Sequence, residues 1–249
     1  MSPGSTTPVL EVSGLRRAFG GLVAVNDLGF AVPQGEIMGL LGPNGSGKTT
    51  ALNLMSGVLR PDAGAIRLMG ENIAGLASYR IARLGLSRTF QLVRVLDGMD
   101  CRENIKAGVA FQKPHIAAAE AELRIDALLA RVGLAGHDKR PAADLTYIDR
   151  KRLELARSLA ARPRVLLLDE WLAGLNPSEL AIGIDLIRSL RADGITIVLV
   201  EHVMSAVRAL CDRCIVMSSG RKIAEGATAD VLNDAAVVKA YLGGVAADA

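Results

Sequence analysis

Apolar residues between positions 9 and 36 form short runs that are interrupted by turn residues. The interruptions are Gly20-Gly21, Asn26-Asp27 and Pro33-Gln34-Gly35. Runs of this length between such turns predict the strands of a small, mostly antiparallel β layer. Residues 1–8 before them are all Ser, Thr, Gly or Pro apart from the first methionine, which predicts a flexible tail.

Three further apolar runs, at residues 37–41, 165–168 and 195–200, are continuous rather than alternating. The first runs into a glycine-rich loop, after which residues 49–59 carry apolar side chains at helical spacing and stop before Pro61. The other two are followed at once by acidic residues. Continuous runs separated by helical segments predict buried parallel strands with helical crossovers, and therefore an α/β fold with a parallel sheet.

A different pattern covers residues 116–161, where Ala, Leu, Arg and Glu recur at helical periods with a break at residues 133–141. This pattern predicts an inserted helical subdomain. We therefore expect a catalytic core made of residues 9–91 and 161–249, with residues 92–160 forming the helical subdomain.

The composition argues against several classes of function. The formal charge is only +3, from 29 basic and 26 acidic side chains, and aromatic residues make up 3%, which argues against a nucleic-acid partner. No run reaches the roughly 18 apolar residues of a spanning helix, and residues 1–8 do not resemble a secretion signal, so we expect a cytoplasmic protein. Cys211 and Cys214 form a C-x-x-C pair, but we interpret them as buried residues at a helix-to-strand junction because no second ligand pair exists.

The glycine-rich loop after residue 41 carries the clearest chemistry. It reads Gly42-Pro43-Asn44-Gly45-Ser46-Gly47-Lys48-Thr49-Thr50 and matches the pattern G-x-x-x-x-G-K-[ST]. Glycines let backbone N–H groups converge on a phosphate, and the helix that follows adds its positive end. We expect Lys48 to contact the outer phosphates and the Thr49 hydroxyl to bind Mg²⁺.

Polar residues that follow the later apolar runs predict the other side chains around the phosphates and the metal. Asp169 and Glu170 come directly after residues 165–168, at the edge of the sheet where α/β proteins bind ligands. Asp169 suits a Mg²⁺ contact and Glu170 suits the base that activates a water molecule. His202 ends the next run, so we expect it at the same edge, in contact with the γ-phosphate.

The order of these features resembles the ATP-binding cassette (ABC) ATPases from Val9 to Gly243. The motifs are the phosphate loop, Arg88-Thr89-Phe90-Gln91, Leu145-Thr146-Tyr147-Ile148-Asp149, Asp169-Glu170, Ala173-Gly174-Leu175-Asn176-Pro177 and His202. The resemblance implies a P-loop NTPase core that binds ATP and Mg²⁺, with Gln91 at the metal and nucleotide. It also implies that Phe19 stacks on adenine, with ordinary core as its alternative, and that Thr146 and Tyr147 complete the nucleotide site of a second ATPase subunit.

Four segments are similar to ATPases of branched-chain amino acid uptake systems: residues 88–96, the helical insert after them, Ala173-Gly174-Leu175-Asn176-Pro177, and the ending Val237-Val238-Lys239-Ala240-Tyr241-Leu242-Gly243. This similarity implies an amino-acid importer with two transmembrane permease subunits, a second ATPase subunit of the same or a different kind, and a solute-binding protein that acts indirectly. The chain would then lie on the inner face of the cell membrane.

Four positions depart from the family pattern. Thr146 stands for a serine, Ile148 for a glycine, Arg150 for a glutamine and Trp171 for a proline. We expect Ile148 to matter most, because a β-branched residue resists positive φ and adds bulk where a backbone N–H must approach a phosphate. This suggests that the chain completes the opposite site poorly and works in a heterodimer.

Three other functions stay open at this point. One is an ATP sensor without turnover. The second is a soluble ABC ATPase acting on ribosomes or DNA, although neither a second cassette nor a long coiled-coil insertion is present. The third is a GTP-binding switch, although the chain contains no Asn-Lys-x-Asp segment for reading guanine.

Overall fold

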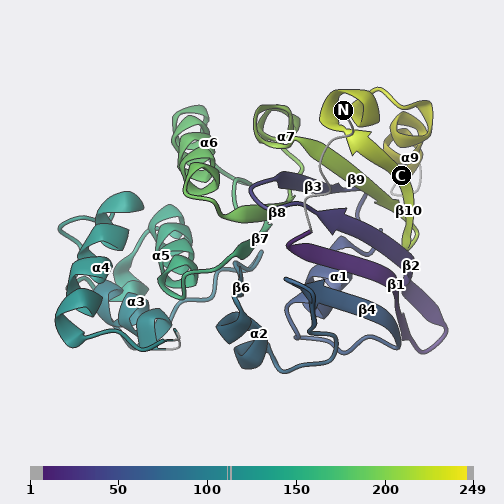
Figure 1. Ribbon diagram of the computed structural model, residues 1–249. Coiled ribbons are helices and arrows are strands. Elements are labelled where there is room, and N and C mark those ends of the chain that lie inside the picture. The colour runs from purple at the N-terminus through teal and green to yellow at the C-terminus, as the bar shows by residue number, and fades with distance from the viewer. Residues whose placement is uncertain (1–7, 111, 113, 246–249) are drawn as a thin grey trace, which may run out of the picture.

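Two β-sheets lie side by side, and a group of helices stands next to them (Figure 1). The computed structural model describes residues 8–110, 112 and 114–245, so the predicted tail lies outside the described residues except for Pro8. In the part of the chain that is described, no helix is both long enough and apolar enough to cross a membrane.

The first sheet is antiparallel and has the strand order β2-β1-β4-β5. Its strands are β1 (Leu10–Phe19), β2 (Leu22–Val32), β4 (Ala63–Leu68) and β5 (Glu71–Asn72). The predicted antiparallel layer is therefore present, with two strands added from beyond residue 36.

The second sheet has the order β10-β9-β3-β8-β7-β6. Its strands are β3 (Ile37–Leu41), β6 (Leu86–Arg88), β7 (Val165–Asp169), β8 (Thr196–Val200), β9 (Arg213–Ser218) and β10 (Arg221–Ala227). All pairs are parallel except the hairpin of β9 and β10. The α/β fold with a parallel sheet is confirmed, and β3, β7 and β8 are buried along their whole length, as their continuous apolar runs predict.

Side chains of the parallel sheet alternate between two apolar cores. On β3, Ile37 and Leu41 pack in the core beneath the helices, whereas Met38 and Leu40 pack in the core shared with the antiparallel sheet. Helix α1 (Lys48–Met55) contributes Leu52 and other residues to that second core, so it lies between the two sheets. The phosphate loop is thereby fixed between a fully buried strand and a buried helix.

Helix α1 is shorter than predicted, because it ends at Met55 rather than Leu59. Gly57 has a left-handed backbone with φ of 71°, and a side chain there would come within 2.5 Å of the Leu76 carbonyl. The helical spacing of the apolar residues continues past this point, but the backbone turns away at the glycine.

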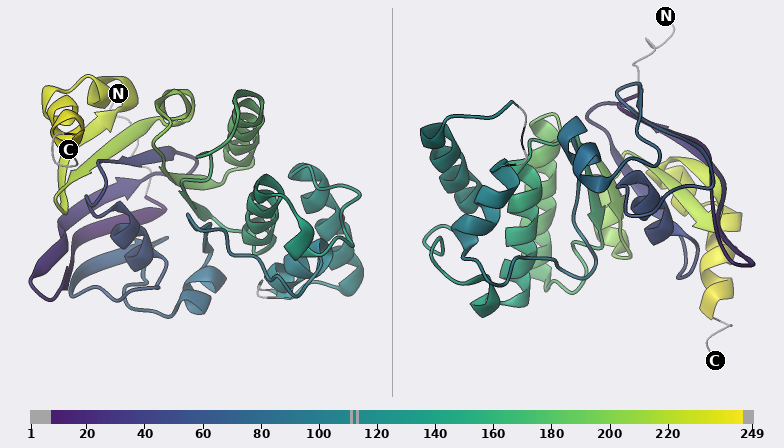
Figure 2. Two further views of the ribbon diagram at one scale, coloured as in Figure 1. Left: turned by 180° about the vertical axis from the view of Figure 1, so that it is seen from behind. Right: turned by 90° about the horizontal axis from the view of Figure 1, so that it is seen from below.

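Helices α3 (Cys101–Ala110), α4 (Ala118–Arg131) and α5 (Tyr147–Ala160) pack on one another and form a lobe beside the sheets (Figures 1 and 2). Helix α3 was not predicted. The division of the chain at residues 91 and 161 stays a prediction. The remaining helices are α2 (Ser78–Leu84), α6 (Pro177–Ala192), α7 (Met204–Leu210), α8 (Thr228–Leu232), α9 (Ala235–Val245) and the short 3₁₀ helix η1 (Ala142–Asp144).

Cys211 and Cys214 are buried between the end of α7 and the start of β9, as expected for residues at a helix-to-strand junction. Both sulfur atoms lie next to Gly39 of β3, where a Cβ atom would come within 2.8 Å of Cys214 Sγ.

Candidate active site

The phosphate loop depends on glycine at both of its ends. Gly42 has φ of 143°, and a Cβ atom there would lie 2.1 Å from the Met217 carbonyl oxygen. Gly47 caps α1 with φ of 103°, and its Cβ would lie 2.3 Å from the Ala24 carbonyl oxygen. No side chain caps α1 and its first turn has no acidic residue, so its N-terminal N–H groups are available to an anion.

Lys48 is 6% exposed, and its ammonium group points back at the loop that carries it. Nζ donates to the carbonyl oxygens of Gly42, at 2.8 Å, and Pro43, at 2.9 Å. Burial lowers the pKa of Lys48 below its ordinary value, and the nearby carboxylates of Glu170 and Asp169 oppose that shift. The cation therefore lies at the loop, within the field of both acidic residues.

The C-terminal helix also reaches the loop. The Gly42 N–H donates to the Tyr241 hydroxyl at 2.8 Å, so α9 satisfies the first backbone donor after β3. Sequence reasoning missed this role, because Tyr241 is 199 residues away along the chain.

Asp169 ends β7 and is 2% exposed. Its Oδ2 accepts a hydrogen bond from Arg88 Nη2 at 2.8 Å, and Arg88 Nη1 donates to Asn53 Oδ1 of α1 at 2.6 Å. Asp169 Oδ1 is buried and has no hydrogen-bond partner among the described residues. A buried carboxylate oxygen without a donor fits a hard cation such as Mg²⁺.

The described residues contain no group of three His, Cys, Asp or Glu side chains that would enclose a metal by themselves. Mg²⁺ is commonly held by one or two carboxylates together with substrate phosphates, so a single acidic ligand near a phosphate loop suits this ion. Thr49 is exposed at the start of α1, where its hydroxyl can reach such an ion.

Glu170 follows Asp169 and meets two further predicted residues. Gln91 Nε2 donates to Glu170 Oε2 at 2.9 Å, and His202 Nε2 lies 2.7 Å from Glu170 Oε1. Glu170 has φ of 51°, a left-handed conformation that costs a residue other than glycine about 1–3 kcal/mol. The structure thus brings Gln91, Glu170 and His202 together at the sheet edge, and His202 contacts Glu170.

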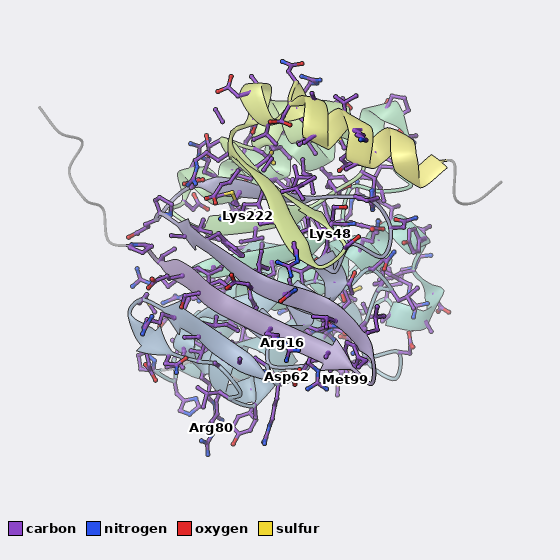
Figure 3. All side chains as sticks on the ribbon, turned by 90° about the vertical axis from the view of Figure 1, so that its right-hand side faces the viewer. Arg16, Lys48, Asp62, Arg80, Met99 and Lys222 are labelled. Atoms are coloured by element: carbon purple, nitrogen blue, oxygen red, sulfur yellow. The ribbon has the colours of Figure 1, made fainter. Side chains whose placement is uncertain are left out.

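Phe19 lies at the end of β1 with 43% of its surface exposed, so the alternative that it is ordinary core is wrong. Asp62 fixes this end of the strand, because its carboxylate accepts from Arg17 Nη1 at 2.9 Å and from the Ala18 N–H at 2.7 Å. Figure 3 shows Asp62 beside Arg16 at the same end of the antiparallel sheet. The Arg17 guanidinium lies 4.9 Å from the Phe19 ring centre, so the ring already faces a cation on one side.

Thr146 and Tyr147 lie apart from this cluster, at the start of α5. Thr146 caps the helix, since its Oγ1 accepts from the Asp149 N–H at 3.3 Å and donates to Asp149 Oδ2 at 2.8 Å. Tyr147 is 58% exposed. Both residues are therefore presented outward rather than toward the phosphate loop of their own chain.

The expectation for Ile148 is wrong in its first part. Ile148 is the second residue of α5, and its φ is not positive, so its β-branch causes no backbone strain there. Its side chain lines a small hollow together with Trp171, Leu175 and Gly183. Because residue 148 lies in α5 and needs no positive φ, the strain argument for a heterodimer no longer holds.

Helix α5 also holds the segment that carries Gln91. Glu154 is 1% exposed and accepts from the Arg94 N–H at 2.9 Å and the Phe90 N–H at 3.4 Å. Burial raises the pKa of Glu154 to about 7, although these two N–H donors oppose the shift. Residues 90–94 are therefore fixed to the helical lobe by a buried carboxyl group.

Comparison with known proteins agrees with this site. A profile described as ABC transporter matches residues 25–173, which is more than half of the chain. The chain belongs to the ABC transporter ATP-binding family. A second profile, described as branched-chain amino acid ATP-binding cassette transporter, matches residues 221–247, the segment that contains Tyr241.

Individual relatives extend the similarity over almost the whole chain. BraF of Pseudomonas aeruginosa, a high-affinity branched-chain amino acid transport ATP-binding protein, is 40% identical over 95% of this chain and 98% of its own length. LivG of Escherichia coli K12, which has the same description, is also 40% identical with the same coverage. The crystal structure of MJ1267 in its ADP conformation, an ATP-binding cassette of an ABC transporter, has a TM-score of 0.85 at 28% identity and covers 96% of this chain and 100% of MJ1267.

This ABC ATPase therefore binds nucleotide and hydrolyses ATP, and the hydrolysis is coupled to transport. The GTP-binding switch and the soluble non-transport ATPase find no support in these relatives. The phosphate loop, Asp169 and Glu170 lie where the sequence predicts them, whereas the contacts of Arg88 with Asp169 and of Tyr241 with Gly42 are seen only in the structure.

Proposed function

We propose that this ABC ATPase energises a membrane importer of branched-chain amino acids. The observation that carries the proposal is the full-length similarity, at 40% identity, to BraF and LivG. The C-terminal match at residues 221–247 supports it independently. The chain itself would not contact the cargo, so its role is to bind and hydrolyse ATP for the permease.

ATP would bind with its phosphates in the loop of residues 42–50, against the N–H groups of the loop and of α1. Lys48 would exchange its bonds to the Gly42 and Pro43 carbonyls for bonds to the outer phosphates. Phe19 would stack on the adenine with the ring face that Arg17 leaves open.

Mg²⁺ would be held by the Thr49 hydroxyl, by Gln91 and by Oδ1 of Asp169, together with the phosphates of ATP. When bound, the ion offsets the negative charge that develops on the phosphates during hydrolysis. Arg88 engages Oδ2 of Asp169, so Oδ1 is the oxygen that remains for the metal.

Glu170 would act as the general base. The oxygen of a water molecule attacks the γ-phosphorus, the bond to the β–γ bridging oxygen breaks, and the proton of the water passes to the Glu170 carboxylate. His202, which contacts Glu170 Oε1, would turn its Nε2 to the γ-phosphate once ATP is bound. Gln91 links this carboxylate to residues 90–94 and so to the helical lobe.

The transporter would contain two transmembrane permease subunits, and one of them would dock on a hollow of about 450 Å³ between α2, β6, α3 and α5. Its lining is largely apolar and includes Val58, Tyr79 and Leu96, each of which is more than a third exposed. Phe90 also lines it, next to Gln91, which gives the permease a direct route to the active site. The chain would thus lie peripherally on the cytoplasmic face of the membrane, with the solute-binding protein acting only through the permease.

A second ATPase subunit would close on the exposed start of α5, where Thr146 and Tyr147 are presented. This subunit could be identical or different, because the Ile148 strain argument for a different one no longer holds. The competing function is that of a degenerate member with weak turnover, which the replacement Arg150 still favours.

Uptake of radiolabelled leucine in cells that lack the gene tests the transport proposal. We expect uptake to be lost and to return with the wild-type chain, and two hydrophobic proteins should co-purify with it from membranes. Uptake that does not depend on the chain would refute an importer of branched-chain amino acids. Normal uptake by a complex in which only the other ATPase hydrolyses ATP would favour the degenerate role.

A further inference from the structure

The loop after β7 holds its first residue in an unfavourable conformation. Glu170 has φ of 51°, and a residue other than glycine keeps such a backbone only where its surroundings fix it. The Glu170 N–H donates to the Val200 carbonyl at 2.9 Å, which fixes the amide side of the residue. The opposite side, its carbonyl, needs a partner as well.

Lys151 of α5 supplies that partner. Its Nζ donates to the Glu170 carbonyl at 3.2 Å and to the Ala173 carbonyl at 2.7 Å, so one ammonium group spans the loop of residues 170–173. Lys151 is only 2% exposed, and its Nζ also lies 5.1 Å from the Tyr147 ring centre. Burying an ammonium group is costly, and the two carbonyl bonds together with the nearby carboxylates of Glu201, Glu154 and Glu170 offset that cost.

Trp171 connects the loop of residues 170–173 back to α5, this time with the donor on the loop. Its Nε1 donates to the Lys151 carbonyl at 3.2 Å, and its ring is 3% exposed. Gly183 of α6 makes room for the ring, because a Cβ atom there would lie 3.2 Å from Trp171 Cζ3. The side chain of a proline has no N–H group, so a proline at position 171 could not form this bond.

Glu201 fixes the middle of the loop. It is fully buried at the end of β8, and its Oε1 accepts from the Leu172 N–H at 2.6 Å. Burial lowers the pKa of Lys151, while Glu201 and Glu154 oppose that shift, which is consistent with a lysine held inside this acidic surrounding.

We propose that Lys151 is a positioning residue of the hydrolysis reaction: it holds residues 170–173 in place so that the Glu170 carboxylate stays between Gln91 and His202. The hydrogen bond from Trp171 fixes the Lys151 backbone, and so sets how far the Lys151 ammonium group reaches into the loop. The inference rests on the proposed role of Glu170 as the general base. None of the side-chain contacts that the structure gives Lys151 reaches the phosphate loop, so its loss changes turnover rather than ATP binding.

The test is a double-mutant cycle on ATP hydrolysis by the full-length chain in its membrane complex. Lys151→Met should lower kcat by about 10-fold or more with KM for ATP changed by less than about twofold. In a Glu170→Gln background, measured by single-turnover phosphate release, Lys151→Met should add less than about a further twofold loss, because its target is already disabled.

An equal fold-loss in the two backgrounds, or an unchanged kcat, would overturn the inference. Lys106→Met is the matched control, because the Lys106 side chain is 65% exposed and pairs with Glu122 at 3.5 Å, and it should leave kcat unchanged. If Lys151→Met fails to fold, Trp171→Phe decides: it keeps a ring but removes the N–H, and should lower kcat by about 2- to 10-fold at constant KM. Unchanged kcat in Trp171→Phe would then overturn the inference.

The same experiment separates this inference from the proposed function. If Glu170→Gln alone keeps full turnover, the role of Glu170 as base fails. If Glu170→Gln loses turnover while Lys151→Met does not, only the positioning role of Lys151 fails.

Discussion

At the scale of single residues, Lys48 shows how the loop is prepared for a polyanion. Its ammonium group is buried and bonded to two carbonyl oxygens of its own loop, which are weaker partners than phosphate oxygens. The carboxylates of Glu170 and Asp169 support its charge. ATP therefore meets a cation that already lies at the loop.

Replacing Lys48 by alanine should weaken ATP binding by about 10- to 100-fold, the value of one or two charge-assisted hydrogen bonds. Isothermal titration with ATP and Mg²⁺ measures this directly. Lys106→Ala, an exposed lysine on α3, serves as the control and should bind ATP like wild type. Equal ATP affinity in the Lys48 variant would count against the phosphate-binding role of the loop.

The sequence predicts residues whose position follows from the neighbouring strands and loops. It does not predict residues whose role depends on contacts with parts of the chain that are far away in sequence. Asp169 ends β7, His202 lies two residues after β8, and Lys48 follows the glycine-rich loop after β3, so the pattern of strands and loop predicts their common edge. Arg88 and Tyr241 contact Asp169 and Gly42 across 81 and 199 residues, and nothing in their immediate neighbours indicates those partners. Lys151 looks like any basic residue of an exposed helix until its burial is seen.

At the scale of elements, α5 is the connection between the helical lobe and the site. Glu154 fixes the backbone of residues 90–94, and Lys151 fixes residues 170–173, so one helix contacts the segments of both Gln91 and Glu170. Figure 2 shows this helix on the side of the lobe that faces the sheets. The sequence predicted α5 but not its orientation, because its polar residues at 151 and 154 gave no sign of being buried.

Buried Glu201 should make stability depend on pH. Burial raises its pKa from 4.5 to about 7, so between these values the folded state keeps a proton that the unfolded state has lost. The free energy of unfolding should therefore fall as the pH rises through this range, and Glu154, whose pKa is also raised, adds to the effect.

Glu201→Gln keeps an oxygen for the Leu172 N–H but cannot ionise, so it should reduce the pH slope by at most about 1.4 kcal/mol per pH unit. Urea unfolding of wild type and variant at about pH 5 and about pH 8 measures the slope. The same slope in both proteins would mean that Glu201 ionises as easily in the folded chain as in the unfolded chain.

At the scale of the whole molecule, two surfaces lie near residues 90–94. The hollow between α2, α3 and α5 lies on one side of these residues, and the exposed start of α5 lies on another. Permease contact at the hollow and subunit contact at α5 would both act on residues 90–94 and 170–173. This arrangement is what an ATPase needs if transport and hydrolysis are to be coupled, and it depends on packing that no local motif reveals.

Tyr79→Asp introduces a charge on the rim of the hollow at a residue that is 49% exposed, so folding and ATP binding should stay intact. Co-purification with the permease should fall by about 10-fold or more, since a charge buried at an interface without a partner is costly. Leu123→Asp on α4, where Leu123 is 71% exposed and outside the hollow, is the matched control. Equal co-purification of both variants would move the docking surface elsewhere.

ATP hydrolysis at Glu170 is proposed to drive transport. The most direct measurement compares ATP hydrolysis and leucine uptake by membrane complexes that contain either the wild-type chain or Glu170→Gln. In the Glu170→Gln complex, turnover should fall by about 10²- to 10⁴-fold and uptake should be lost, while ATP binding is retained. Turnover and uptake at the wild-type level in Glu170→Gln would contradict it.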